Sequence, residues 1–510
     1  TNVTAFTTTQ LASLDAAQVA AMATAALAAL DGAQFAAFNT TQVRALTATQ
    51  MAALDATDIG DFTTTQIAAL TSTQTRALTQ TNIEALAETQ VAALTATQVQ
   101  SITTTNLRAM ADTQIAALTT TQLGALATSQ VQGLNATNVQ ALTTTQVAAL
   151  STTQLTQLNN TNLRALADTQ MQALSTTQVR ALTTAQVAAL ESTDIGELTE
   201  TQIAALHATQ VSAISATNFA TLADTQIAAL TATQIQAAST SQVAALTETQ
   251  VAALTTTQVA AMSTSQMRAF DQTNFSALDG AQMAALTATQ IAGLTTTQIT
   301  DLNATDLGEL TTTQVAALTS AQVKALTETN LGDLVETQIA ALTASQIASL
   351  TTGNVSALAE TQAAALTTTQ IAALSTSQMR ALSETNLAAL DATQVAAMTT
   401  AQARALTVTQ IEALSAGDMA EFTTTQLANF VTTQTAAFTA TSVAQLAATQ
   451  IAAFGASQIG RMATDTLQAL DATQMAALTT TQLKGVTSTQ IDALAAEDVA
   501  ERSEEHTSEL

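Results

Sequence analysis

The chain repeats every eight residues almost from end to end, and this short period constrains its fold more than any other feature. The consensus octad is T-x-T-Q-[V/I/L]-x-A-L. Thr143–Leu150 (TTTQVAAL) is one complete copy, whose residues we number as positions one to eight. A fixed short period is the signature of a repeat architecture, so we expect one continuous array rather than separate globular domains.

The pattern within each octad predicts a short helix. Positions five and eight, such as Val147 and Leu150, share a face on a helix but would point to opposite faces of a strand. Ala, which favours helices, is common at positions six and seven. Position one is mostly Thr, Ser, Asp or Asn and position four is Gln, which together form a capping box. We expect Thr143 to cap the N–H of Gln146, and Gln146 to reach back to Thr143.

One long helix does not fit the period. Eight residues advance about 80° beyond two full turns, so an apolar stripe would wind around a continuous helix. We therefore expect a break at every octad, with a bend between positions eight and one, as at Leu150–Ser151. Such short helices must stack on their neighbours. Positions five and eight should be buried, and position six, as at Arg164 and Arg180, should be exposed.

These patterns predict an all-α solenoid with one very short helix per octad. A β-solenoid is the alternative, because Thr and Val favour strands and an even period suits them. The frequent Ala-Ala-Leu triplet and the scarcity of Gly at the bends favour the helical fold.

A second, longer period is written at position four. Gln is replaced there at intervals of three or four octads, with one skipped beat at Gln250. We call the replaced residues the position-four stripe: Asn2, Ala26, Asp58, Asn82, Asn106, Asn138, Asn162, Asp194, Asn218, Asn274, Asp306, Asn330, Asn354, Asn386, Asp418, Ser442, Thr466 and Asp498. Their mean spacing predicts a superhelix with about 3.5 octads, or about 28 residues, per turn. Duplication of a seven-octad unit is the alternative explanation.

Composition excludes several classes of protein. The formal net charge is −26, and the 12 Lys and Arg residues are too scattered for a phosphate-binding stripe, so we expect no nucleic-acid partner. Thr and Gln interrupt every apolar run, so we expect no insertion into a membrane. The chain contains no Cys, which excludes disulfides and Cys-ligated metals.

Pairs of acids are the one candidate site for an ion. Every Asp of the position-four stripe has an acid three residues later, and one Asn does too: Asp58 with Asp61, Asp194 with Glu197, Asp306 with Glu309, Asp418 with Glu421, Asp498 with Glu501, and Asn330 with Asp333. Carboxylates so spaced lie side by side on a helix and repel. A Ca²⁺ ion between turns would relieve the repulsion. Two solvated carboxylates are the alternative, and no Ca²⁺-loop motif is present.

Nothing in the sequence indicates catalysis. His207, at the capping position of its octad, has no nucleophile or ligand partner beside it in the sequence, and we expect it at the surface. We find no Ser–His–Asp set, phosphate-binding loop or dinucleotide fingerprint, so we assign no catalytic, cofactor-binding or metal-binding residue. The Thr residues of positions one and three should cap helices, although a flat Thr array could also order water as ice-binding proteins do.

The octad T-x-x-Q-[I/V]-A-A-L resembles repeats of very large bacterial secreted and cell-surface proteins, which often read L-T-P-E-Q-[I/V]-A-A-L. The resemblance implies a spacer or adhesin-like role outside the cell or on its surface, with partners among cell-surface or extracellular matrix components. We expect a structural extender or adhesive region. A ligand-binding or ice-binding solenoid is the alternative.

The two ends of the chain do not fit the octad frame. The chain opens in the middle of an octad, so residues 1–501 look like a fragment of a longer solenoid. The frame fails after Arg502, and residues 502–510 (RSEEHTSEL) resemble the in-frame translation of a common short-read sequencing adapter. We treat those residues as a non-native tail and exclude them from the interpretation.

Overall fold

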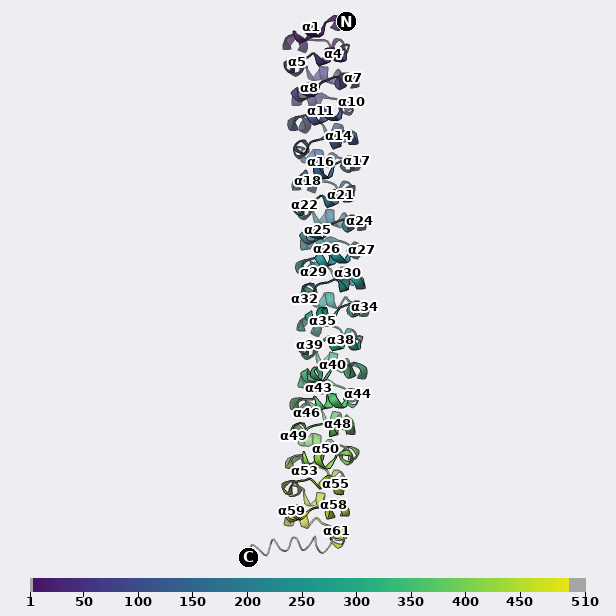
Figure 1. Cartoon of the computed structure of the whole chain (residues 1–510), viewed down its shortest axis with the longest axis vertical. Helices are drawn as coiled ribbons and strands as arrows, with labels where there is room; N and C mark the ends of the chain where they lie inside the picture. The colour runs from purple at the N-terminus through teal and green to yellow at the C-terminus, as the bar shows by residue number, and fades with distance from the viewer. Residues whose placement is uncertain (1–2, 495–510) are drawn as a thin grey trace. The chain divides into compact units, whose positions relative to one another are not determined.

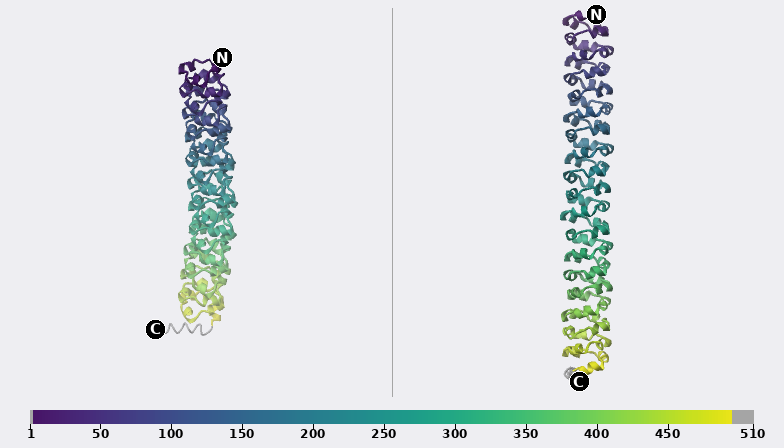
Figure 2. Two further views of the ribbon diagram at one scale, coloured as in Figure 1. Left: turned by 45° about the horizontal axis from the view of Figure 1, so that its top comes forward. Right: turned by 90° about the vertical axis from the view of Figure 1, so that its right-hand side faces the viewer.

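A computed structural model describes residues 3–494 of the chain. The pair Asp498 and Glu501 and the tail at 502–510 lie outside the described residues. The chain divides into two compact units, Thr1–Ala261 and Met262–Leu510. Within each unit, short helices follow one another turn upon turn (Figures 1 and 2).

The prediction of one short helix per octad is confirmed. The described residues form a single 3₁₀ turn, Val3–Ala5, and 61 α-helices, and no strand occurs among residues 3–494. The first unit runs from α1 (Thr8–Ala12) to α32 (Thr256–Ala261), and the second from α33 (Thr264–Met267) to α61 (Ser488–Ala493). The helices hold four to six residues, so the β-solenoid is not what this sequence forms.

The helix starts where the capping box predicts. In α18 (Thr144–Ala149), the side chain of Thr143 accepts a hydrogen bond from the Gln146 N–H at 3.2 Å. The N–H of Thr143 in turn donates to Gln146 Oε1 at 2.6 Å. Leu150 has the extended ψ of 133° that ends the helix and directs the chain into the next octad. The bend therefore falls between positions eight and one, as predicted.

Positions five and eight line the interior of each unit. Val147 is 0% and Leu150 4% exposed, whereas Arg164 and Arg180 at position six are exposed. Each helix packs mainly against the helix three octads further along, as α26 (Ala208–Ala213) does against α29 (Ala232–Ala237). Burial of the two apolar positions between turns supplies the hydrophobic stabilisation that a single five-residue helix lacks.

The Gln at position four ties each turn to the turn before it. Besides its capping bond, Gln146 donates from Nε2 to the carbonyl oxygens of Ile115 at 2.9 Å and Leu118 at 2.7 Å. These carbonyls end the helix four octads earlier, 31 and 28 residues back, and Gln146 is only 3% exposed. We call this contact the cross-turn amide bond. It satisfies carbonyls that a helix end leaves without an intrahelical partner.

The same bond recurs in both units. Gln74 donates to the carbonyls of Val43 and Leu46, each at 2.7 Å. Gln402 donates to those of Ile371 and Leu374 at 2.7 and 2.6 Å. The capping box predicted the bond that the side-chain oxygen accepts, but not the bonds that its nitrogen donates.

The position-four stripe makes the cross-turn bond with shorter side chains. The Nδ2 atoms of Asn82 and Asn162 donate to the carbonyls of Leu54 at 2.8 Å and Leu134 at 2.6 Å, each 28 residues earlier. The Thr466 hydroxyl does the same to Phe438 at 2.7 Å. The recurrent separation confirms about 28 residues, or 3.5 octads, per turn.

These stripe residues lie inside the solenoid rather than facing a partner. Asn82 is 0% and Asn162 is 2% exposed. Because Asn is one methylene shorter than Gln, the neighbouring turns must approach more closely along the stripe. Stripe helices are correspondingly short, such as α20 (Asn160–Leu163) and α27 (Ala216–Phe219) with four residues each. The long period therefore has a geometric reason.

Replacing Gln146 by Ala should destabilise its turn by about 2–4 kcal/mol, because the Leu118 carbonyl and the Thr143 N–H lose a buried partner. Faster amide exchange confined to the turns on either side would show the effect, since each turn contacts only its neighbours. The exposed Gln140 is the matched control, and Gln140→Ala should change little. Equal effects of the two substitutions would contradict the role of the cross-turn amide bond.

Candidate functional site

The four described aspartates of the position-four stripe keep one half of the local hydrogen bonding and lose the other. The Oδ2 atoms of Asp58, Asp194 and Asp418 accept the N–H of position one in their own octads at 2.7–2.9 Å. Asp306 accepts the Asn303 N–H at 3.3 Å. A carboxylate has no proton to donate, however, so it cannot make the cross-turn bond that Asn makes at the same place.

The acid three residues further on packs over the start of a helix in the preceding turn. A Cβ atom on Gly280 would lie 3.0 Å from Glu309 Oε1, and one on Gly32 would lie 2.7 Å from Asp61 Oδ1. Glycine at these two sites makes room for the carboxylate. Gly280 begins α35 (Gly280–Ala285), which packs against α38 (Ala304–Glu309).

A third carboxylate stands beside each pair. It belongs to the preceding turn, at position one or two of the octad that follows the carbonyl facing the stripe Asp. We call the resulting groups the acid clusters: Asp31, Asp58 and Asp61; Asp168, Asp194 and Glu197; Asp279, Asp306 and Glu309; Asp391, Asp418 and Glu421. Each cluster concentrates negative charge at one contact between turns.

Burial and mutual repulsion hold protons on these clusters. Burial, together with the carboxyls of Asp168 and Asp194, raises the pKa of Glu197 to about 7. Burial, aided by the carboxylates of Asp306 and Asp279, raises the pKa of Glu309. The same two causes, with Asp418 and Asp391 as neighbours, raise the pKa of Glu421.

The Oε2 atoms of Glu197 and Glu421 are also buried without a hydrogen-bond partner. Burial is likewise the main cause that raises the pKa of Asp58, against the lowering effect of its hydrogen bond from the Asp55 backbone.

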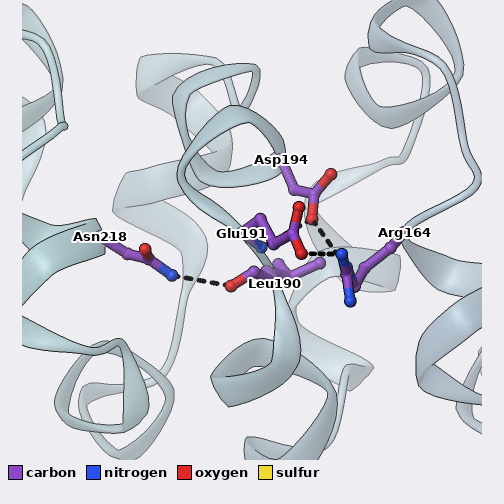
Figure 3. A network of polar contacts seen from close by, with 5 residues as sticks. All are labelled: Arg164, Leu190, Glu191, Asp194 and Asn218. Carbon is purple, nitrogen blue, oxygen red and sulfur yellow. Dashed lines mark hydrogen bonds and ion pairs between the residues drawn. The ribbon is translucent and has the colours of Figure 1, made fainter.

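One cluster carries a compensating cation (Figure 3). Arg164, from the preceding turn, forms an ion pair with Glu191, and its Nε lies 3.9 Å from Asp194 Oδ2. Burial raises the pKa of Asp194, and the Arg164 guanidinium opposes that rise. Asn218, in the following turn, donates to the Leu190 carbonyl at 2.7 Å and so ties the next turn to this one. Among residues 3–494, Arg164 is the only cation in an ion pair.

The acid clusters are not arranged as a calcium site. Their carboxylates perturb one another's titration, but residues 3–494 contain no group of three or more His, Cys, Asp or Glu side chains that could hold a metal ion. His207 lies exposed at the start of α26, as expected, and its side chain makes no capping bond. The position-one Thr residues serve as helix caps.

The third carboxylate of each cluster was missed from the sequence, although a signal for it exists. An acid precedes Asp58, Asp306 and Asp418 by 27 residues and Asp194 by 26 residues. That spacing is close to one turn, so the 28-residue period applied to charges would have found it.

Replacing Glu197 by Gln should reduce the loss of stability that the protein suffers as the pH rises. Because the Glu197 pKa in the folded chain lies above its unfolded value of about 4.5, the folded state binds the proton more tightly. Stability should therefore be highest below pH 4.5 and fall as the pH rises to 7. Urea titrations from pH 4.5 to 8 would measure this dependence. Glu248→Gln, at an exposed site, is the control and should leave the profile unchanged.

Comparison with known proteins places two segments of the chain in a described repeat family. A model of the ALTTAQ repeat matches residues 27–64 and 157–192. Residues 181–186 of this chain read ALTTAQ and run from position seven of one octad to position four of the next. No curated protein sequence matches the chain. The two matched segments are thus similar to the ALTTAQ repeat.

Proposed function

We propose that this chain is a structural extender, a repeat region of a large bacterial exoprotein that sets a distance without catalysing a reaction. The observation that carries the proposal is the cross-turn amide bond, which links each turn to the preceding one along both units. Such an array gains length by adding turns and needs no closed core. The match to a repeat family and the resemblance to repeats of bacterial surface proteins support the same role.

Adhesion is the second candidate, because the outer surface presents exposed Thr and Asp side chains in every turn. The high negative charge favours solubility and disfavours contact with anionic lipid. Among residues 3–494, no helix combines the length and apolar character that a membrane crossing requires. We expect the chain to work outside the cell or on its surface.

An extender should shorten in proportion to the turns removed. Deleting residues 107–162 removes 56 residues, about two turns, and joins Asn106 to Leu163 with octad and stripe in register. Dyes on Thr81→Cys and Thr184→Cys, the only thiols in this Cys-free chain, should approach by about 16–20 Å at a helix packing distance of about 8–10 Å per turn. Energy transfer between the dyes measures the change.

A deletion of 40 residues, 107–146, is the matched control. It keeps the octad but places the stripe out of register, so short Asn side chains would face gaps that need Gln. We expect this variant to lose stability and the longer deletion to keep it. If neither deletion changes the dye separation, the extender proposal fails. If beads coated with the intact chain bind matrix glycans or proteins, adhesion is favoured instead.

A further inference from the structure

The side chains of the position-four stripe form a natural comparison series. Asn354 and Asn386 donate to the carbonyls of Leu326 at 2.9 Å and Leu358 at 2.7 Å, each one turn earlier. Asp306 has the same side-chain length and the same burial, 4% exposed against 2% for both asparagines. It differs from them in carrying an oxygen where Asn carries the donating NH₂ group. The carbonyl one turn before Asp306 belongs to Leu278.

We propose that the four acid clusters are proton-operated joints between turns, at which protonation of the stripe Asp supplies the missing cross-turn donor. In the ionised form, the carboxylate oxygen faces the carbonyl of the preceding turn and only repels it. When a proton binds, the carboxyl O–H donates to that carbonyl, as the Asn Nδ2–H does elsewhere. The joint then has the hydrogen bonding of an Asn turn and one negative charge fewer.

The surroundings of each stripe Asp favour this reaction. Asp306 faces Asp279 and Glu309, both carboxylates, across the contact between α38 and α35. Asp418 in α52 (Ala416–Ala420) faces Asp391 and Glu421, while α55 (Ala440–Val443), packed against α52, carries no charged residue. Repulsion within each group is relieved by one proton.

The other two clusters differ in their neighbours. Asp58 is flanked by Asp55 and Asp61 in its own octad, and the Asp61 carboxylate lies against Gly32, next to Asp31. Asp194 is flanked by Asp168, Glu191 and Glu197, but Arg164 balances part of that charge. We therefore expect the joint at Asp194 to stay more closed at neutral pH than the joints at Asp306 and Asp418.

The inference predicts turns that tighten on acidification, in a chain whose net charge of −26 would otherwise be expected only to decrease in magnitude. The raised pKa values of Glu309 and Glu421 place the uptake of protons above the usual range of carboxylates. The proton shared within a cluster then reaches the stripe Asp without strong acid.

Amide exchange of the full chain, compared at pH 5 and pH 8 after correction for intrinsic rates, tests the joint directly. In the wild type, residues 271–278 and 303–310 should be about five- to tenfold better protected at pH 5, the effect of about one hydrogen bond. Asp306→Asn supplies the donor at every pH, so its protection at pH 8 should equal that of the wild type at pH 5. The turn at Asp418 serves as an internal reference and should keep its pH dependence.

The reverse substitution is the matched control. Asn330→Asp replaces a donor that lies 3.3 Å from both the Thr300 and Leu302 carbonyls, and should create a pH-dependent turn where none existed. Glu309→Gln removes a neighbouring charge but leaves the donor missing, so it should weaken the pH dependence without abolishing it. The proposal is overturned if Asp306→Asn leaves the pH dependence intact, if Asn330→Asp creates none, or if Glu309→Gln alone removes it.

Discussion

The cross-turn amide bond is the interaction on which the rest of this structure depends. A helix of five or six residues leaves most of its backbone donors and acceptors without an intrahelical partner. Gln at position four serves both kinds: its oxygen accepts at the start of its own helix, and its nitrogen donates at the end of a helix one turn earlier. Burial of positions five and eight then brings together turns whose polar groups are already satisfied.

Much of the fold could be predicted from the sequence because its causes are local. The i, i+3 spacing of Val147 and Leu150 and the Thr143–Gln146 capping box each act within one octad, and both were read correctly. The 28-residue turn was also predictable, since closer approach along one line permits only short side chains there. The cross-turn bonds were not, because a capping box accounts for the Gln oxygen and does not reveal that the Gln NH₂ group is buried against carbonyls 28 and 31 residues away.

The candidate site was predicted in part for the same reason. Asp306 and Glu309 are neighbours on one helix, so their pairing follows from sequence spacing alone. Asp279 joins them only through the register between turns, and Gly280 matters only because a carboxylate lies over it. The interpretation as a calcium site considered charge and ligand type without that register. The structure brings the third carboxylate near enough to raise a pKa but not into a coordinating arrangement.

The acid clusters acquire a mechanical meaning if the chain is an extender. Force applied along a stack of turns passes through every contact in series, so the weakest contact decides where the stack opens. Gln and Asn turns repeat nearly the same bonds, and none of them is distinguished from its neighbours. The stripe aspartates interrupt that uniformity, 136 residues apart in the first unit at Asp58 and Asp194, and 112 residues apart in the second at Asp306 and Asp418. About four or five regular turns therefore separate consecutive weak contacts within a unit. Because nearest-neighbour contacts dominate such arrays, opening at one contact leaves the intervening turns folded.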